Sequence, residues 1–237
     1  MKNKRIAIII PTYNEKDNIV PLVEDILRLP LDISVIIVDD NSPDGTGDIA
    51  KRYFRNNPRV QVIVRKKNRG RGYAGRCGYK IALNRKFDVI GEMDGDFSHS
   101  PEFIPSFIFL LEKADVVSGS RFLSGGKSLR QDRIRELITI FARVYLHLIL
   151  GIKLTDPTSG FRFFTFSSLA AIYPELRSKD AFIVTEVFYY TFKKKFRIME
   201  TPIIFYRRRY GSSKLKFNTL IAYLFRVLLL RIWLFYG

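Results

Sequence analysis

Short apolar segments alternate with segments of helical periodicity through the first 120 residues of the chain. The apolar segments are rich in β-branched residues, which is typical of strands that are buried on both faces of a sheet. Strands are predicted at 5–10, 33–40, 60–64, 89–93 and 116–118, with helices between them at 18–29, 48–55, 73–85 and 102–113. The alternation predicts an α/β fold in which helices flank a mostly parallel sheet.

The pattern changes after Ser120. Apolar residues between positions 134 and 149 recur every three or four residues, which predicts one amphipathic helix. Further strands are predicted at 161–165 and 203–206, a helix at 185–194 and a C-terminal amphipathic helix at 218–235. We therefore expect a main domain over residues 1–210 and a C-terminal segment over residues 211–237.

Basic residues outnumber acidic ones, and the excess is concentrated near the C-terminus. The 40 lysines and arginines face 23 aspartates and glutamates, which gives a net charge of +17. Residues 193–237 contain 11 of these basic residues, a single acidic one, Glu200, and many aromatic side chains. Such a mixture suits an anionic membrane surface, and it also suits single-stranded nucleic acid. Charge alone does not separate the two partners.

Two features argue against whole classes of protein. Cys77 is the only cysteine, so the chain forms no internal disulfide, and with two histidines it lacks a usual set of zinc ligands. The longest apolar segment, 220–236, contains Arg226 and Arg231, which a membrane-spanning helix tolerates poorly. We predict no transmembrane helix and expect this segment to lie on an anionic membrane surface.

Pairs of carboxylates follow two of the predicted strands. Asp39 and Asp40 end the second strand, and Asp94 and Asp96 follow the fourth with Gly95 between them. Open α/β sheets bind ligands at the carboxyl ends of their strands. Two oxygen ligands in this spacing suit Mg²⁺ or Mn²⁺ shared with phosphates, and Gly95 lets a diphosphate approach the backbone. An aspartate after a strand can instead cap the next helix, so the pattern is weak by itself.

A glycine-rich sequence, Gly70-Arg71-Gly72-Tyr73-Ala74-Gly75, matches the dinucleotide-binding pattern G-x-G-x-x-G. It follows the third predicted strand rather than the first, and four basic residues separate it from that strand. This position argues against a nicotinamide cofactor. We expect a turn at which a ligand phosphate passes close to the backbone N–H groups at the start of a helix.

Seven short motifs occur in a fixed order along residues 5 to 216. They are IIIPTYNE from Ile8, VDDNSPDGT from Val38, NRGRGYA from Asn68, MDGDFSH from Met93, GSRF from Gly119, DPTSGFR from Asp156 and RRYGSSKL from Arg208. Together they resemble the signatures of inverting GT-A glycosyltransferases, and more closely those of polyprenyl-phosphate sugar synthases of the dolichyl-phosphate mannose synthase type. The resemblance implies a GT-A, Rossmann-like catalytic domain over 1–210 and a membrane-interface segment over 211–237.

The resemblance also implies a role for each matching position. The nucleotide sugar would be bound by Pro11, Tyr13, Glu15, Val38, Asp40, Asp94, Gly95, Arg208 and Lys214. The phosphate of the acceptor would be bound by Arg121, Arg135, Thr139 and Arg208. The metal, Mg²⁺ or Mn²⁺, would be bound by Asp94, Asp96 and Ser98, and the catalytic residues would be Asp94, Asp96, Arg121 and Asp156.

Ser98 departs from the family pattern, because several mannose synthases carry glutamine at this position. A hydroxyl is a weaker metal ligand than an amide carbonyl, so Ser98 is expected to act through water or not at all. Enzymes that use UDP-sugars share these signatures, so a UDP-sugar donor stays open as an alternative.

The implied reaction transfers a sugar, mannose from GDP-mannose, to a polyprenyl or dolichyl phosphate with inversion at the anomeric carbon. The acceptor phosphate is already anionic at neutral pH, so the reaction needs a positioned nucleophile and a stabilised leaving group more than a strong base. The close alternative is a UDP-sugar donor or a saccharide acceptor. A saccharide hydroxyl requires a carboxylate base, for which Asp156 and Glu186 are the candidates. His99 and His147 are assigned to packing.

The implied location is the cytoplasmic face of a membrane, with peripheral attachment. Lys214, Lys216 and Arg226 are expected at the lipid headgroups, and a membrane-spanning partner subunit is left open. The distant alternative is a basic nucleic-acid-binding module. The acidic pairs at the strand ends argue against it, because they repel phosphate unless a metal is bound. Nucleic acid is therefore not an expected partner.

Overall fold

The computed structural model describes residues 4–129, 133–207 and 217–232, with the backbone alone for 133–136 and 217–220. Its main sheet has seven strands in the order β3-β2-β1-β4-β7-β5-β8. The strands are β1 (Ile6–Thr12), β2 (Ile33–Asp39), β3 (Val60–Val64), β4 (Val89–Glu92), β5 (Val116–Ser120), β7 (Arg162–Thr165) and β8 (Ile198–Pro202). β7 runs antiparallel to β4 and β5, and the other pairs are parallel. The predicted α/β class with a mostly parallel sheet is confirmed.

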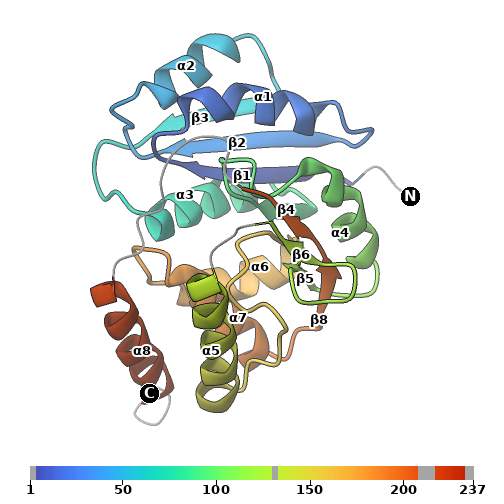
Figure 1. The fold of residues 1–237 in the computed structure, drawn as a ribbon. Helices are drawn as coiled ribbons and strands as arrows, with labels where there is room; N and C mark the ends of the chain where they lie inside the picture. The colour runs from blue at the N-terminus through green and yellow to red at the C-terminus, as the bar shows by residue number, and fades with distance from the viewer. Residues whose placement is uncertain (1–3, 130–132, 208–216, 233–237) are drawn as a thin grey trace.

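Helices cover both faces of this sheet (Figure 1). One face carries α1 (Lys16–Leu27), α2 (Thr46–Tyr53) and α4 (Ile104–Leu110), and the other carries α3 (Arg71–Asn84), α6 (Phe166–Ile172) and α7 (Ile183–Lys193). In β1, Ile8 and Ile10 pack under the first set, while Ala7 and Ile9 pack under the second. Both faces of the central strands are therefore buried, which explains their uninterrupted apolar sequence.

Two further helices lie side by side at one end of the molecule (Figure 1), α5 (Arg133–Leu150) and α8 (Phe217–Ile232). Leu146 of α5 and Val227 of α8 are fully buried in a third apolar cluster, together with Phe188 of α7. The Tyr145 hydroxyl donates to the carbonyl of Leu224 at 2.9 Å. One face of α8 is thus packed against the protein.

Arg226 of α8 was expected at the lipid headgroups, which stays a prediction, and its side chain also makes contacts within the protein. Its guanidinium pairs with Asp180 at 2.7 Å and lies over the ring of Phe182, 4.2 Å from the centroid. The residue is therefore held by the loop before α7. The predicted boundary at residue 210 lies outside the described residues and stays a prediction.

Several elements were not predicted. β8 was missed because its sequence, Ile-Met-Glu-Thr-Pro, has little apolar character, as suits a strand at the edge of the sheet. Also missed were α6 and the short strand β6 (Lys127–Ser128), which pairs with β9 (Ile204–Phe205) in a second sheet. The predicted helix at 102–113 is divided into a 3₁₀ turn, Pro101–Phe103, and α4.

Among the described residues, no helix combines the length and the apolar character that crossing a membrane requires.

Candidate active site

The residues singled out from the sequence gather at one edge of the sheet. β1, β2, β4 and β5 run in the same direction, so all of them end at this edge, while the antiparallel β7 begins there. Glu15 follows β1, Asp40 follows β2, Asp94 follows β4 and Arg121 follows β5. Asp156 lies in the segment that leads into β7. These described residues therefore share one edge of the sheet, and the roles assigned to them stay predictions.

Asp96 and Ser98 form a fixed pair below the surface. The Asp96 Oδ1 atom accepts hydrogen bonds from the backbone N–H of Ser98 at 3.0 Å and from its hydroxyl at 2.5 Å. Both residues are buried, whereas the side chain of Asp94 is 32% exposed. Ser98 thus orients the Asp96 carboxylate, and its role as a metal ligand stays a prediction.

Asp94 is joined to a buried network of charges that the sequence analysis missed. Nη2 of Arg71 lies 2.9 Å from Asp94 Oδ1, and Nη1 lies 2.7 Å from Oε1 of Glu92. The other oxygen of Glu92 accepts from Arg162 at 2.9 Å and from the hydroxyl of Tyr79. A glutamate inside a buried apolar strand was the signal available in the sequence, since such a residue is expected to have a charged partner.

Burial and charge act in opposite directions on Glu92. Burial by itself raises the pKa of this carboxyl group, but Arg162 and Arg71 lower it, and the net result is a pKa below the usual value. Glu92 is therefore an anion that two guanidinium groups stabilise inside the protein.

His99 packs against the metal motif. Its Nδ1 atom accepts a hydrogen bond from the backbone N–H of Asp94 at 3.1 Å. Its ring stacks on Phe161 with 4.9 Å between centroids, and it meets the edge of Phe205 at 5.3 Å. Burial lowers the pKa of His99. The predicted packing role is confirmed for His99 but wrong for His147, which is exposed on α5.

Arg121 and Asp156 form a two-point ion pair. Nε and Nη2 of Arg121 lie 2.6 and 2.7 Å from the two oxygens of Asp156, whose side chain is fully buried. Glu200 of β8 fixes the same segment by accepting from the backbone N–H groups of Thr155 and Asp156 at 2.8 and 3.0 Å. Asp156 therefore holds the guanidinium of Arg121 in a fixed orientation at the end of β5, and Glu200 holds the segment that carries Asp156.

The predicted nucleotide-binding residues differ in their accessibility. Tyr13 is 38% exposed, and Pro11 and Glu15 are half-buried. Asp40 accepts from Arg65 at 2.8 Å and from the backbone N–H of Gly70 at 2.5 Å. Burial raises the pKa of Asp40, and these two donors oppose the shift.

Val38 and Gly95 complete this group of predicted residues. Val38 is fully buried in the apolar cluster beneath α3, so its side chain packs in the core, and its role in nucleotide binding stays a prediction. A Cβ atom on Gly95 would lie 3.2 Å from Thr12 and 3.7 Å from the side chain of Glu15. Gly95 therefore brings the metal motif close to the end of β1.

The glycine-rich turn before α3 does not bind phosphate in the way that was expected. The backbone N–H groups of Gly72 and Tyr73 donate to the carbonyl of Lys179 at 3.1 and 3.3 Å. A Cβ atom on Gly70 would lie only 2.4 Å from that carbonyl oxygen. The glycines thus let the start of α3 approach the loop before α7, and the protein itself uses these N–H groups.

The described residues cover only part of the predicted acceptor site. Thr139 is half-buried on α5, and Arg135 lies in the first turn of this helix, where the backbone alone is described. Arg208 and Lys214 lie outside the described residues. Their predicted roles stay predictions.

The Asp94–Asp96 pair fits a divalent cation that is shared with a substrate. Within the part of the chain that the structure describes, no three His, Cys, Asp or Glu side chains gather to form a complete metal cage. Mg²⁺ commonly uses one or two carboxylates and completes its shell with substrate phosphates and water. A partly exposed Asp94 beside a fixed Asp96 offers this kind of site.

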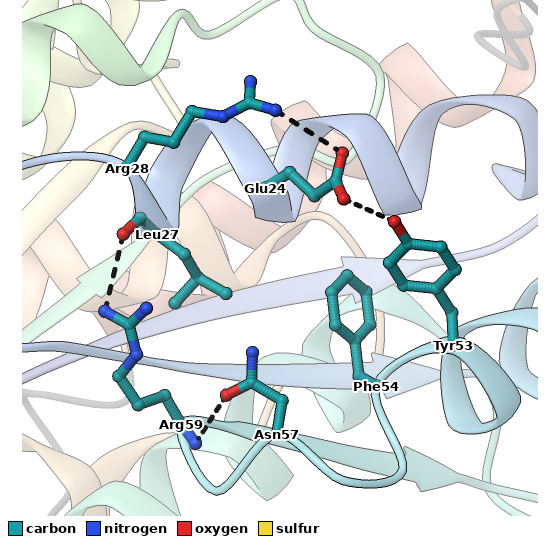
Figure 2. A pocket seen from close by; sticks show the side chains of 7 residues that line it. All are labelled: Glu24, Leu27, Arg28, Tyr53, Phe54, Asn57 and Arg59. Atoms are coloured by element: carbon teal, nitrogen blue, oxygen red, sulfur yellow. Dashed lines mark hydrogen bonds and ion pairs between the residues drawn. The ribbon is translucent and has the colours of Figure 1, made fainter.

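A concavity of about 300 Å³ lies elsewhere, at the ends of α1 and α2 (Figure 2). Its lining side chains already bind one another: the Tyr53 hydroxyl donates to Glu24 at 2.5 Å, and Arg59 donates to the carbonyl of Leu27 at 3.4 Å. None of the predicted site residues lines it. It is separate from the candidate active site.

The chain is similar to several characterised proteins. Residues 7–173 match the family model described as glycosyl transferase family 2. The chain is 38% identical to an undecaprenyl-phosphate mannosyltransferase of Micrococcus luteus, over 89% of this chain and 87% of the relative. It is 31% identical to a polyprenol monophosphomannose synthase of Mycolicibacterium smegmatis, over 94% of this chain and 86% of the relative.

A solved structure shares the fold. Glucosyl-3-phosphoglycerate synthase from Mycobacterium tuberculosis, in complex with Mn²⁺, UDP and glucosyl-3-phosphoglycerate, superposes with a TM-score of 0.69. The match covers 94% of this chain and 77% of that chain at 19% sequence identity. The likeness confirms the GT-A-like α/β fold.

Proposed function

Because the chain belongs to glycosyl transferase family 2 and, within it, to the polyprenyl-phosphate mannosyltransferases, we propose that it transfers mannose from GDP-mannose to a polyprenyl phosphate with inversion. The observation that carries the proposal is the meeting of the Asp94–Asp96 pair and the Arg121–Asp156 pair at one sheet edge. The Asp94–Asp96 pair suits the metal and the diphosphate of the donor. The Arg121–Asp156 pair places a guanidinium at the same sheet edge, where it suits the acceptor phosphate.

The carboxylates that a saccharide acceptor would need as a base are already engaged. Asp156 is bound by Arg121 through both of its oxygens. Glu186 accepts from the backbone N–H groups of Arg177 and Ser178 at 3.0 and 2.9 Å. A phosphate acceptor is already anionic and needs no such base, so these contacts favour it over a hydroxyl acceptor.

In the proposed reaction, an oxygen of the acceptor phosphate attacks the anomeric carbon from the face opposite the nucleoside diphosphate. The bond from that carbon to the diphosphate breaks, and its electron pair leaves with the diphosphate. Asp94 and Asp96 would hold Mg²⁺ or Mn²⁺, which when bound stabilises negative charge on the leaving group. Asp156 keeps Arg121 oriented, and Arg121 attracts the acceptor phosphate.

We place the enzyme peripherally on the cytoplasmic face of a membrane, where the lipid acceptor presents its phosphate. The support is an apolar surface on the paired helices α5 and α8. Its residues are more than a third exposed, and they are Leu137, Ile140, Phe141, Val144, Leu148, Ile221, Phe225, Leu228, Leu229 and Ile232. Exposed apolar residues that gather on neighbouring helices are typical of a membrane-binding surface.

The test is a transfer assay with purified protein, undecaprenyl phosphate in detergent and either Mg²⁺ or Mn²⁺. We expect mannose from GDP-mannose to appear in the lipid fraction, and we expect GDP to raise the melting temperature more than UDP does. Transfer to a saccharide but not to the lipid phosphate would overturn the acceptor assignment. Transfer from UDP-sugars alone would overturn the donor assignment.

A further inference from the structure

We propose that Arg71 is a positioning residue whose guanidinium holds Asp94 and weakens the affinity of the Asp94–Asp96 pair for a divalent cation. The inference rests on the metal site of the proposed function, but its test uses Mn²⁺ alone and needs neither substrate. A metal ion that binds Asp94 therefore competes with the guanidinium of Arg71, which already contacts this carboxylate.

Arg71 connects two carboxylates that belong to the same strand end. It occupies the first position of α3, and its Nη1 and Nη2 atoms lie 2.7 Å from Glu92 and 2.9 Å from Asp94. The side chain of Arg71 is 23% exposed, and that of Glu92 is fully buried. A guanidinium with two anchored nitrogens keeps its orientation, because each hydrogen bond restrains the rotation that would break the other.

The charge balance around Glu92 leaves the positive charge of Arg71 available to Asp94 as well. Arg162 lies opposite Glu92 in the register of β4 and β7, and its Nη2 atom lies 2.9 Å from the Glu92 carboxylate. Glu92 is therefore already neutralised by a fully buried guanidinium. Arg71 supplies a second positive charge, which Glu92 and Asp94 share, so two guanidinium groups balance the two carboxylates.

The segment before β7 confines this contact. A Cβ atom on Gly160 would lie 2.6 Å from Nη2 of Arg71 and 3.4 Å from Oδ1 of Asp94. The backbone at Gly160 thus passes directly over the Arg71–Asp94 pair and limits the space into which the guanidinium can move. The same segment contains Asp156, which pairs with Arg121.

A cation beside a metal ligand opposes metal binding through Coulomb repulsion, which is strong where little water screens it. Removing the charge of Arg71 makes the electrostatic potential at the Asp94–Asp96 pair more negative. We therefore expect Arg71→Met to bind Mn²⁺ about tenfold more tightly or better. Structural damage to the site would change the affinity in the opposite direction, so this readout separates the proposed role from a purely structural one.

The experiment titrates Mn²⁺ into the full chain without nucleotide, with free Mn²⁺ followed by electron paramagnetic resonance. Arg71→Lys keeps the charge and should stay within about threefold of wild type. Arg69→Met removes an exposed arginine from the same turn and is the control for the loss of one positive charge. It should also leave the affinity within about threefold, because an exposed charge is screened by solvent.

A second variant keeps the inference testable if Arg71→Met does not fold. Gly160→Ala retains Arg71 but places a methyl group 2.6 Å from the position of Nη2, so the flexible end of the arginine must shift and its contact with Asp94 is weakened. Its Mn²⁺ affinity should also increase. Unchanged or weaker binding in the folded variants would overturn the role of Arg71 while leaving the metal site in place. Absence of Mn²⁺ binding in wild type and variants alike would overturn both.

Discussion

Arg121 and Asp156 form a two-point ion pair in which two guanidinium nitrogens lie 2.6 and 2.7 Å from the two carboxylate oxygens. The carboxylate of this pair is fully buried. Two more contacts hold the pair in place. The Nη2 atom of Arg121 also donates to the hydroxyl of Thr158 at 2.7 Å, and its guanidinium lies over Phe205, 5.2 Å from the ring centroid. The loop that follows β5 and the segment that precedes β7 are therefore joined at this point.

We expect this pair to contribute measurably to stability. Arg121→Met and Asp156→Ala should each lower the free energy of unfolding by about 3 kcal/mol, because either change leaves one charge of a buried pair without its partner. The double variant should lose less than the sum, with a coupling energy of about 1–3 kcal/mol. Urea denaturation of the four proteins measures this cycle.

The matched control is the exposed pair of Arg28 and Asp25, which are 2.7 Å apart with side chains 71% and 44% exposed. Its cycle should give a coupling of at most about 0.5 kcal/mol, since exposed ion pairs are screened by solvent. Equal coupling energies for the two pairs would contradict the special role of burial at Arg121.

Asp94→Asn and Asp96→Asn should abolish divalent-dependent transfer while the fold persists. Each change removes one anionic ligand, and an asparagine at position 96 can still accept from Ser98 through its side-chain oxygen. Transfer of mannose in the presence of Mn²⁺ measures the loss, and the melting temperature reports the fold. Asp25→Asn, on the exposed face of α1, is the control. Normal turnover in either site variant would remove the metal assignment.

The strands that the sequence predicted correctly are those whose own residues show the pattern of a buried strand. β1 and β2 were placed to within about two residues, because both faces of these strands are buried and their sequence shows this directly. β8 could not be placed in this way, since Met199 and Glu200 show no apolar pattern and the strand is identified only by its pairing with β5.

The same limit explains the candidate site. Asp94 and Asp96 lie two residues apart in the sequence and belong to one motif, so they were found. The charged residues around them belong to segments that are distant in the sequence. Glu92 contacts Arg162 because β7 pairs antiparallel with β4, and Arg71 lies at the start of α3. The sequence suggested a phosphate at the glycine-rich turn, but the backbone of Lys179 occupies its N–H groups.

His99 should make stability depend on pH in a defined window. Burial holds the pKa of the native imidazole below its usual value of about 6.5, so the unfolded chain binds a proton more readily than the native protein does. The contribution of His99 is therefore fully present above about pH 6.5 and decreases as the pH falls through that value toward the native pKa. Urea denaturation of the metal-free protein between pH 5 and 8 measures it.

Two variants isolate this effect. His99→Asn retains an acceptor for the backbone N–H of Asp94 but does not titrate, so its stability should vary less across the window. His147→Asn changes the other histidine, which is exposed on α5, and should keep the dependence of the wild type. The interpretation fails if the His99 variant loses stability below pH 6.5 as steeply as the wild type.

The apolar surface of α5 and α8 gives the last prediction, which concerns membrane binding. Leu148 of α5 is 73% exposed and Phe225 of α8 is 61% exposed. The opposite face of α8 is engaged, because Val227 is fully buried and the Tyr223 hydroxyl lies 2.6 Å from the hydroxyl of Thr185. α8 is therefore a packed helix that also presents apolar side chains outward, and its binding to a membrane surface stays a prediction.

This arrangement decides which variants to test. Deleting residues 218–237 would remove Val227 from the apolar cluster and destabilise the domain, so loss of binding by the deletion would not identify the surface. Single substitutions at exposed positions leave the cluster intact.

Leu148→Glu and Phe225→Glu should each lower the affinity for phosphatidylserine vesicles about tenfold or more, as measured by sedimentation. Each change removes an apolar side chain whose burial in the membrane contributes about 2 kcal/mol, and it introduces a negative charge. Phe109→Glu is the matched control, since Phe109 is 58% exposed on α4, away from both helices. It should bind as the wild type does, and equal losses for Phe109→Glu and Phe225→Glu would show that the membrane does not select this surface.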